Sequence, residues 1–230
     1  MTNWNKFWAT YPLKFGSKDY FKQVGKTVNG QPISDYQFKL IISDICNGLD
    51  LEKTDVVLDL CCGNGIITKE IAGKCKEVVG VDFSQPLLEV AKREHSLGNI
   101  KYVFGSVLDL DKILFEPSHF NEVIMYEGLQ NFKKKDLLGI LRNIQKLTGN
   151  ESVIFIGSIP DKKRIWKFYN TPKRRLLFLC RKLLGGDAIG SWWDKDFIKK
   201  TCKKLDLCCE FREQSKGIHT AHYRFDIKIQ

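Results

Sequence analysis

The amino-acid sequence predicts an α/β fold built on a parallel, doubly wound sheet. Three observations lead to this prediction. Apolar runs of strand length alternate with helical patterns from residue 56 to residue 160. These runs are apolar throughout, which is typical of strands that are covered on both faces. A turn with two glycines follows the first run, as expected where a ligand lies at the carboxyl end of a parallel strand.

The predicted elements follow one another in a regular order. Apolar residues at helical spacing predict a helix over residues 34–49, for which Ser34 is the N-cap. Pro86 suits the first turn of a later helix. The elements predicted after residue 49 are a strand at 56–60, a helix at 66–73, a strand at 76–84, a helix at 85–96, strands at 100–106 and 121–127, a helix at 133–148 and a strand at 151–159.

The two ends of the chain differ from this alternating region. Residues 1–33 are rich in aromatic residues, glycine and proline without a clean period, so we expect an irregular arm with a short helix. Residues 161–204 look helical and basic, and residues 206–214 and 221–230 look like a closing antiparallel strand pair. We therefore predict one domain over residues 1–230, with an N-terminal arm and a basic helical insertion.

Length and composition exclude several classes of protein. The chain has 230 residues and 43% hydrophobic content, which suffices for one well-buried domain. The opening residues lack the apolar core of a signal peptide, and no stretch approaches the roughly 18 apolar residues that a membrane helix needs. We expect a cytoplasmic protein. The eight cysteines form no CxxC pair, so we expect reduced cysteines and no metal site.

The positive charge is concentrated in one segment. The formal net charge is +10, and residues 161–204 hold 14 lysines and arginines against four aspartates, which accounts for the whole excess. Such a local excess predicts a face that meets an anionic partner. Three interpretations stay open: a helical cover with solvated lysines, a surface for an anionic sugar or a lipid-linked glycan at a membrane, and an RNA-binding face.

The glycine turn narrows the choice of ligand. Gly63 and Gly65 fit the start of a dinucleotide fingerprint, but Thr68 stands where that fingerprint has its third glycine. Asp82 ends the second strand and can accept hydrogen bonds from a ribose diol. Asp59 lies inside the first strand, where its charge would repel a pyrophosphate. The pattern therefore favours S-adenosylmethionine, which is cationic and has no phosphate, over NAD.

Four segments carry a family resemblance. VLDLCCGNG, VVGVDFS, IKYVFGSVLDL and NEVIMYEGLQNF resemble the class I S-adenosylmethionine-dependent methyltransferases in order and spacing, over residues 35–160. The resemblance implies a Rossmann-like, seven-stranded sheet that is mostly parallel and has an antiparallel last strand. It also implies S-adenosyl-L-methionine as cofactor and S-adenosyl-L-homocysteine as product.

The resemblance also implies roles for single residues. Asp59, Gly63 and Gly65 match positions that cradle the methionine end of the cofactor. Asp82 matches the acid that binds the ribose, and the neighbouring Phe83 can lie against the adenine.

Three further positions match the cofactor-binding pattern of this family. Ser106 and Val107 match positions that meet the adenine edge, although the family usually has aspartate where Ser106 stands. Tyr126 ends the fourth strand, where the family places residues beside the methionyl group and the substrate.

Methyl transfer from a sulfonium mainly requires that the nucleophile is positioned for in-line displacement. If the acceptor is a hydroxyl, a general base helps. Glu127, His219 and His222 are the candidates, because they lie at strand ends that can reach the mouth of the cofactor site. His95, in a polar helix end, and His119, in a loop before a strand, are weaker candidates for the general base.

The loop after the fourth strand informs the choice of acceptor. It lacks the Pro-Pro motif of base N-methyltransferases, whereas YEGLQNF and the two-tryptophan segment 190–207 are similar to the small-molecule and sugar branch. We therefore expect an anionic small-molecule, sugar or lipid-linked acceptor, methylated on a hydroxyl oxygen, with the aromatic arm as a lid. The alternatives are an RNA methyltransferase that uses residues 161–204 and a catalytically silent cofactor-binding module.

Overall fold

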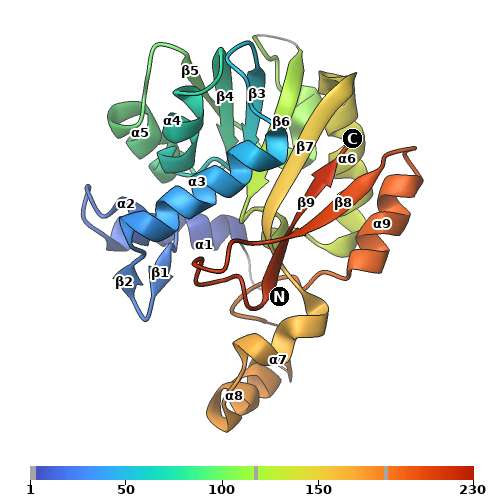
Figure 1. Cartoon of the computed structure of the whole chain (residues 1–230). Coiled ribbons are helices and arrows are strands. Elements are labelled where there is room, and N and C mark those ends of the chain that lie inside the picture. Colours follow the sequence, from blue (N-terminus) through green and yellow to red (C-terminus); the bar gives the residue numbers. More distant parts are fainter. Residues whose placement is uncertain (1–3, 117–118, 184–185) are drawn as a thin grey trace.

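The computed structural model describes residues 4–116, 119–183 and 186–230. Its centre is a seven-stranded sheet with the order β5-β4-β3-β6-β7-β9-β8 (Figure 1). The first five of these strands run parallel, and β9 is antiparallel to both β7 and β8. The predicted mostly parallel sheet with an antiparallel last strand is therefore confirmed. The strands are β3 (Val56–Leu60), β4 (Glu77–Asp82), β5 (Ile100–Phe104), β6 (Phe120–Tyr126), β7 (Thr148–Pro160), β8 (Cys209–Glu213) and β9 (Arg224–Ile229).

Helices cover both faces of the sheet. One apolar cluster joins α3 and α4 to one face, and a second cluster joins α6 and α9 to the other. No described helix is long and apolar enough to cross a membrane. The helices are α1 (Trp4–Thr10), α2 (Tyr20–Gln23), α3 (Asp35–Leu49), α4 (Ile66–Ala72), α5 (Gln85–Glu94), α6 (Leu137–Leu147), α7 (Ile165–Phe168), α8 (Pro172–Leu183) and α9 (Lys195–Lys203), and the short 3₁₀ helices are η1 (Pro12–Lys14), η2 (Val107–Lys112), η3 (Leu129–Asn131), η4 (Lys134–Asp136) and η5 (Lys162–Arg164).

The helix predicted at 34–49 shows why these elements form where the sequence places them. The Ser34 side chain accepts a hydrogen bond from the backbone of Gln37, as expected of an N-cap. Asp50 ends the helix in the left-handed conformation, with a φ of 55°. Ile41, Ile45 and other apolar residues at helical spacing are buried against the sheet. Capping and apolar spacing thus define α3.

The N-terminal arm has more regular structure than expected. It contains α1, η1, α2 and a hairpin of β1 (Thr27–Val28) and β2 (Gln31–Pro32). Distant residues hold it: the Ser84 hydroxyl donates to the Trp8 carbonyl at 2.7 Å, and the Asn64 amide donates to the Tyr20 carbonyl at 2.9 Å. A short helix was expected in this arm, but elements as short as η1, β1 and β2 leave no periodic pattern, so the sequence did not predict them. Residues 1–3 of the predicted arm lie outside the described residues.

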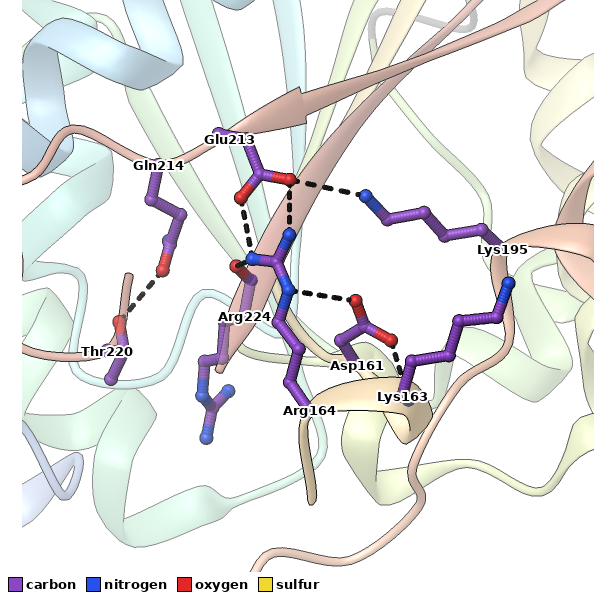
Figure 2. Close-up of polar contacts among 8 residues, drawn as sticks. All are labelled: Asp161, Lys163, Arg164, Lys195, Glu213, Gln214, Thr220 and Arg224. Carbon is purple, nitrogen blue, oxygen red and sulfur yellow. Dashed lines mark hydrogen bonds and ion pairs between the residues drawn. The ribbon is translucent and has the colours of Figure 1, made fainter. Parts of the chain in front are cut away.

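The basic segment is helical in η5, α7, α8 and α9, as expected, with an irregular stretch at 186–194; residues 184–185 lie outside the described part. Figure 1 shows α7 and α8 projecting from the body of the molecule. They follow β7 directly, so they project at the end of the sheet where the parallel strands finish. At their base, Arg164 forms two hydrogen bonds of 2.6 Å with Glu213 of β8 (Figure 2).

Candidate functional site

The glycine turn between β3 and α4 is built from residues with positive φ. Cys61, Gly63 and Gly65 have φ values of 60°, 59° and 76°. A Cβ on Gly65 would lie 2.3 Å from the Tyr102 hydroxyl oxygen, so only glycine lets the turn approach β5 this closely. His95 supports the turn, because its Nδ1 lies 2.7 Å from the Asn64 carbonyl oxygen. This contact gives His95 a structural position beneath the turn.

Asp82 fixes the turn from the neighbouring strand. Its Oδ2 accepts a hydrogen bond from the backbone of Gly63 at 2.9 Å, and its Oδ1 accepts one from the backbone of Ser84 at 2.8 Å. Burial raises the pKa of Asp82, while these backbone donors lower it. A carboxylate oxygen can accept more than one hydrogen bond, so Asp82 can still bind a diol.

Asp59 lies behind the turn. It is 3% exposed, and its Oδ2 accepts a hydrogen bond of 2.6 Å from the Thr68 hydroxyl. Burial raises the pKa of Asp59 to about 7, and the charge of Asp82 adds to this. A cationic ligand would favour the ionised carboxylate, whereas a phosphate would oppose it.

A cavity of about 480 Å³ opens in front of the turn. Gly63, Asp82 and Phe83 line this cavity, whereas Asp59 and Gly65 are not among its described lining residues. One side is made by the aromatic residues of the N-terminal arm, which are Trp4, Phe7, Trp8 and Tyr11. The ring nitrogen of Trp8 is buried and has no hydrogen-bond partner within the described chain. The aromatic residues of the arm thus form part of the cavity wall, and a role of the arm as a lid stays a prediction.

A larger cavity of about 850 Å³ adjoins the first, and Cys61, Phe83 and Asn131 border both. Ser106 and Val107 line the larger cavity. The Ser106 hydroxyl accepts a hydrogen bond from the Leu108 backbone at 3.2 Å. The wall also includes five lysines, which are Lys133, Lys134, Lys135, Lys162 and Lys182.

Glu127 lies directly after β6 on the wall of the smaller cavity, with a φ of 56°. Its Oε2 lies 2.6 Å from the Nζ of Lys26, which is 5% exposed. Burial raises the pKa of Glu127, but the charges of Lys26 and Arg224 outweigh burial and hold the pKa below its usual value. Glu127 is therefore an ionised residue that is tied to a cation.

Arg224, the first residue of β9, also lines this cavity. It is 4% exposed, and its Nη1 donates to the Ser158 carbonyl at 2.6 Å. Its Nε is buried and has no hydrogen-bond partner among the residues described. Sequence reasoning missed Lys26 and Arg224 as site residues. The charged residues of RFDIKI alternate with apolar ones, and all six residues are buried on β9.

His219 lines the same cavity, and its buried Nδ1 has no partner in the described ranges. Burial lowers the pKa of His219, and the charges of Lys26 and Arg224 lower it further, against the opposing charge of Glu127. The ring is therefore neutral near pH 7 and can accept a proton. His222 also lines the cavity but is exposed. The structure thus brings Glu127, His219 and His222 to one wall.

Tyr126 completes the wall beside Glu127. It is 6% exposed, and its hydroxyl accepts a hydrogen bond from the Gln214 amide at 3.3 Å. Burial raises the pKa of Tyr126, and the Lys26 Nζ lies 4.7 Å from the centre of its ring. Tyr126 is therefore a neutral aromatic surface with a cation above it.

Replacing Asp59 with asparagine is expected to stabilise the ligand-free protein above pH 7. Burial raises the pKa of Asp59 from 3.8 to about 7 on folding. The stability that the bound proton provides is complete below pH 3.8 and is lost as the pH rises through about 7. Asparagine keeps an acceptor for Thr68 and avoids this loss, which is on the order of 4 kcal/mol at alkaline pH.

Urea unfolding at about pH 5 and about pH 8 measures this effect. The gain in the free energy of unfolding should be larger at the higher pH. A gain or loss of equal size at both values would contradict the raised pKa of Asp59.

The sequence is similar to those of known proteins. Residues 57–150 match the family model described as a methyltransferase domain. The chain is 27% identical over 178 residues to the demethylmenaquinone methyltransferase of Geobacillus kaustophilus (strain HTA426), which covers 74% of each protein. It is 35% identical over 103 residues to the demethylmenaquinone methyltransferase of Staphylococcus aureus (strain JH9), and this match spans 43% of this chain and only 42% of that protein.

The fold is shared with solved structures. The structure described as a DhpI-SAM-HEP complex superposes with a TM-score of 0.66 at 12% identity, over 98% of this chain and 94% of that chain. The likeness extends over the N-terminal arm and the basic segment as well as the central sheet.

Proposed function

We propose that the chain, which is a class I S-adenosylmethionine-dependent methyltransferase, transfers a methyl group to an oxygen of a small-molecule acceptor. The observation that carries this proposal is His219, a neutral imidazole with a buried, unpartnered nitrogen on the wall of the smaller cavity. A neutral imidazole in this place is suited to take the proton of an acceptor hydroxyl.

The residues around the glycine turn fit the cofactor. Asp82 would accept hydrogen bonds from the ribose, and the Gly63 turn would hold the methionine end. Phe83 would lie against the adenine, with Ser106 and Val107 at its edge, because Phe83 borders both cavities. Two buried acids beneath the turn suit a ligand that brings positive charge. When bound, S-adenosylmethionine supplies a methyl group that is already activated on a sulfonium.

The polar residues opposite the turn would prepare the acceptor. His219 accepts the proton of the acceptor hydroxyl, and the oxygen forms a bond to the methyl carbon as the carbon–sulfur bond breaks and its electron pair goes to sulfur. Lys26 and Arg224 stabilise the developing oxyanion. Glu127 positions Lys26 through their 2.6 Å ion pair. The aromatic arm excludes water from the reacting groups.

The larger cavity supports an acceptor with an anionic group, because lysines lie on its wall and none of the described ion pairs occupies Lys133, Lys162 or Lys182. A quinone-type acceptor is a second candidate, which the similarity to demethylmenaquinone methyltransferases favours. A sugar or glycan with an acidic group would use the same lysines.

Transfer of labelled methyl from S-adenosylmethionine into a fractionated cell extract tests the proposal. Label in a small-molecule or lipid-soluble product supports O-methylation if chemical analysis finds the labelled methyl group in an ether. Label on a ring carbon would favour the quinone-type candidate, and label in RNA would favour an RNA methyltransferase. Absence of transfer with intact cofactor binding would indicate a catalytically silent module. The Asp82→Ala variant serves as the control with weakened cofactor binding.

A further inference from the structure

Helix α8 carries leucines on the face that points away from the protein. The exposed fractions of Leu176, Leu179 and Leu183 are 65%, 51% and 89%. Their spacing of three and four residues places them on one face of the helix. Phe178, by contrast, is 5% exposed and packs on Trp166 and other aromatics. With 3.6 residues per turn, Phe178 lies roughly opposite the leucine stripe.

The inner face of α8 belongs to the candidate site. Arg174 lines the smaller cavity, while Phe178 and Lys182 line the larger one. These three residues are four apart, so they share one face of the helix. The helix therefore has two distinct faces: one lines the cavities, and the other carries the exposed leucines. Figure 1 shows that α8 stands clear of the sheet and its covering helices.

The charge on α8 is not neutralised within the protein. At the base of the projecting segment, Arg164 and Lys195 pair with Glu213, and Arg164 also pairs with Asp161 (Figure 2). Helix α8 itself has no acidic residue, and no ion pair in the described chain involves it. Its cationic residues are Lys173, Arg174, Arg175, Arg181 and Lys182.

Helical position separates these charges from the leucines. Lys173 and Arg175 lie to either side of the stripe of Leu176, Leu179 and Leu183 on a helix of 3.6 residues per turn. An exposed apolar stripe that is bordered by cations is the pattern of a helix that lies in a membrane interface, where leucines enter the acyl region and cations meet anionic headgroups. An RNA-binding surface explains the cations but not exposed leucines.

We propose that α8 docks this protein on a membrane surface that contains anionic lipid headgroups. The leucine stripe enters the interface, and the inner face of the same helix keeps the two cavities next to the lipid. An apolar acceptor could then pass from the membrane into the cavity without crossing water. The docking itself depends only on α8, so it stands independently of the proposed methyl transfer.

Co-sedimentation of the full chain with lipid vesicles tests the proposal, with neither cofactor nor acceptor present. We expect binding to vesicles of phosphatidylcholine with phosphatidylglycerol, weaker binding to phosphatidylcholine alone, and loss of binding as salt increases. The double variant Leu176→Ser, Leu183→Ser should bind at least about tenfold more weakly. The double variant Lys173→Glu, Arg175→Glu reverses the cations on either side of the stripe and should lose the preference for anionic vesicles.

The matched control replaces two exposed leucines that lie outside α8. Leu97 and Leu114 are 41% and 91% exposed, and the variant Leu97→Ser, Leu114→Ser should bind vesicles like the parent protein. Thermal unfolding confirms that each variant is folded. Equal vesicle binding by both leucine variants would overturn the proposal. Absence of vesicle binding would also overturn the proposal. In that case, single-stranded RNA could bind the cations of α8, or the leucine stripe could join two copies of the chain.

Discussion

Replacing Asp82 with alanine is expected to lower the affinity for S-adenosylhomocysteine by at least about tenfold. The carboxylate would accept charge-assisted hydrogen bonds from the ribose, each worth about 1.5–3 kcal/mol. It also holds the glycine turn through the backbone of Gly63 at 2.9 Å. Calorimetric titration measures the affinity. An unchanged affinity would remove Asp82 from the proposed cofactor site.

A ligand analogue can show whether Asp82 binds the ribose directly or acts only by supporting the glycine turn. An S-adenosylhomocysteine analogue without the ribose hydroxyls should bind the parent protein more weakly than the natural ligand does. The Asp82→Ala variant should bind the two ligands with similar affinity, because the partner of the hydroxyls is gone. If the variant still discriminates fully between the ligands, Asp82 acts only through the turn.

Replacing His219 with asparagine is expected to lower kcat for the methyl acceptor by about 10²- to 10⁴-fold, which is the usual contribution of a general base. Asparagine retains polarity and approximate size but cannot take up the proton. Cofactor affinity should stay unchanged, because the proposed cofactor contacts lie across the cavity at Gly63 and Asp82. Steady-state kinetics with the acceptor found by label transfer gives kcat and KM separately.

The pH dependence adds a readout that a merely structural role would not change. Burial lowers the pKa of His219 below 6.5, so the base is protonated and inactive only at acidic pH. The kcat of the parent protein should therefore rise as the pH increases through this pKa, and the His219→Asn variant should lack that rise. His222→Asn is the matched control, because this neighbour is exposed and lines the same cavity. Equal losses in both variants would contradict a special role for His219.

The sequence predicted the central sheet well because its signals are local. The central parallel strands are short apolar runs that are buried on both faces, as at Val56–Leu60, whereas the edge strand β5 is only partly buried. The glycine turn and the acid that ends β4 then indicated the class of methyltransferase, and the family match confirms it. The sequence also predicted the closing antiparallel pair, but it did not predict that β9 inserts between β7 and β8, because no local pattern shows where a strand inserts in a sheet.

The candidate site was predicted only where a motif marks it. Gly63, Asp82 and Phe83, which the motif marks, line the smaller cavity, and their roles in cofactor binding stay predictions. Lys26 escaped prediction because it is buried by an ion pair with Glu127, which is 101 residues away in sequence. Arg224 escaped because a charged residue in an alternating strand usually faces water, whereas here its guanidinium is buried and donates to the Ser158 carbonyl and the Gln130 side chain. Such residues acquire their roles from tertiary contacts, which a single sequence does not display.

The place of β9 in the sheet also affects when the enzyme becomes competent during its synthesis. The ribosome delivers β3 to β7 first, and β7 then presents an open edge, because β8 pairs with β9 rather than with β7. Neither the sheet nor the wall with His219 and Arg224 is complete until residues 224–229 have left the exit tunnel. A nascent chain therefore carries a cofactor turn but no acceptor wall, and the late, long-range pairing of β9 is expected to limit the rate of folding.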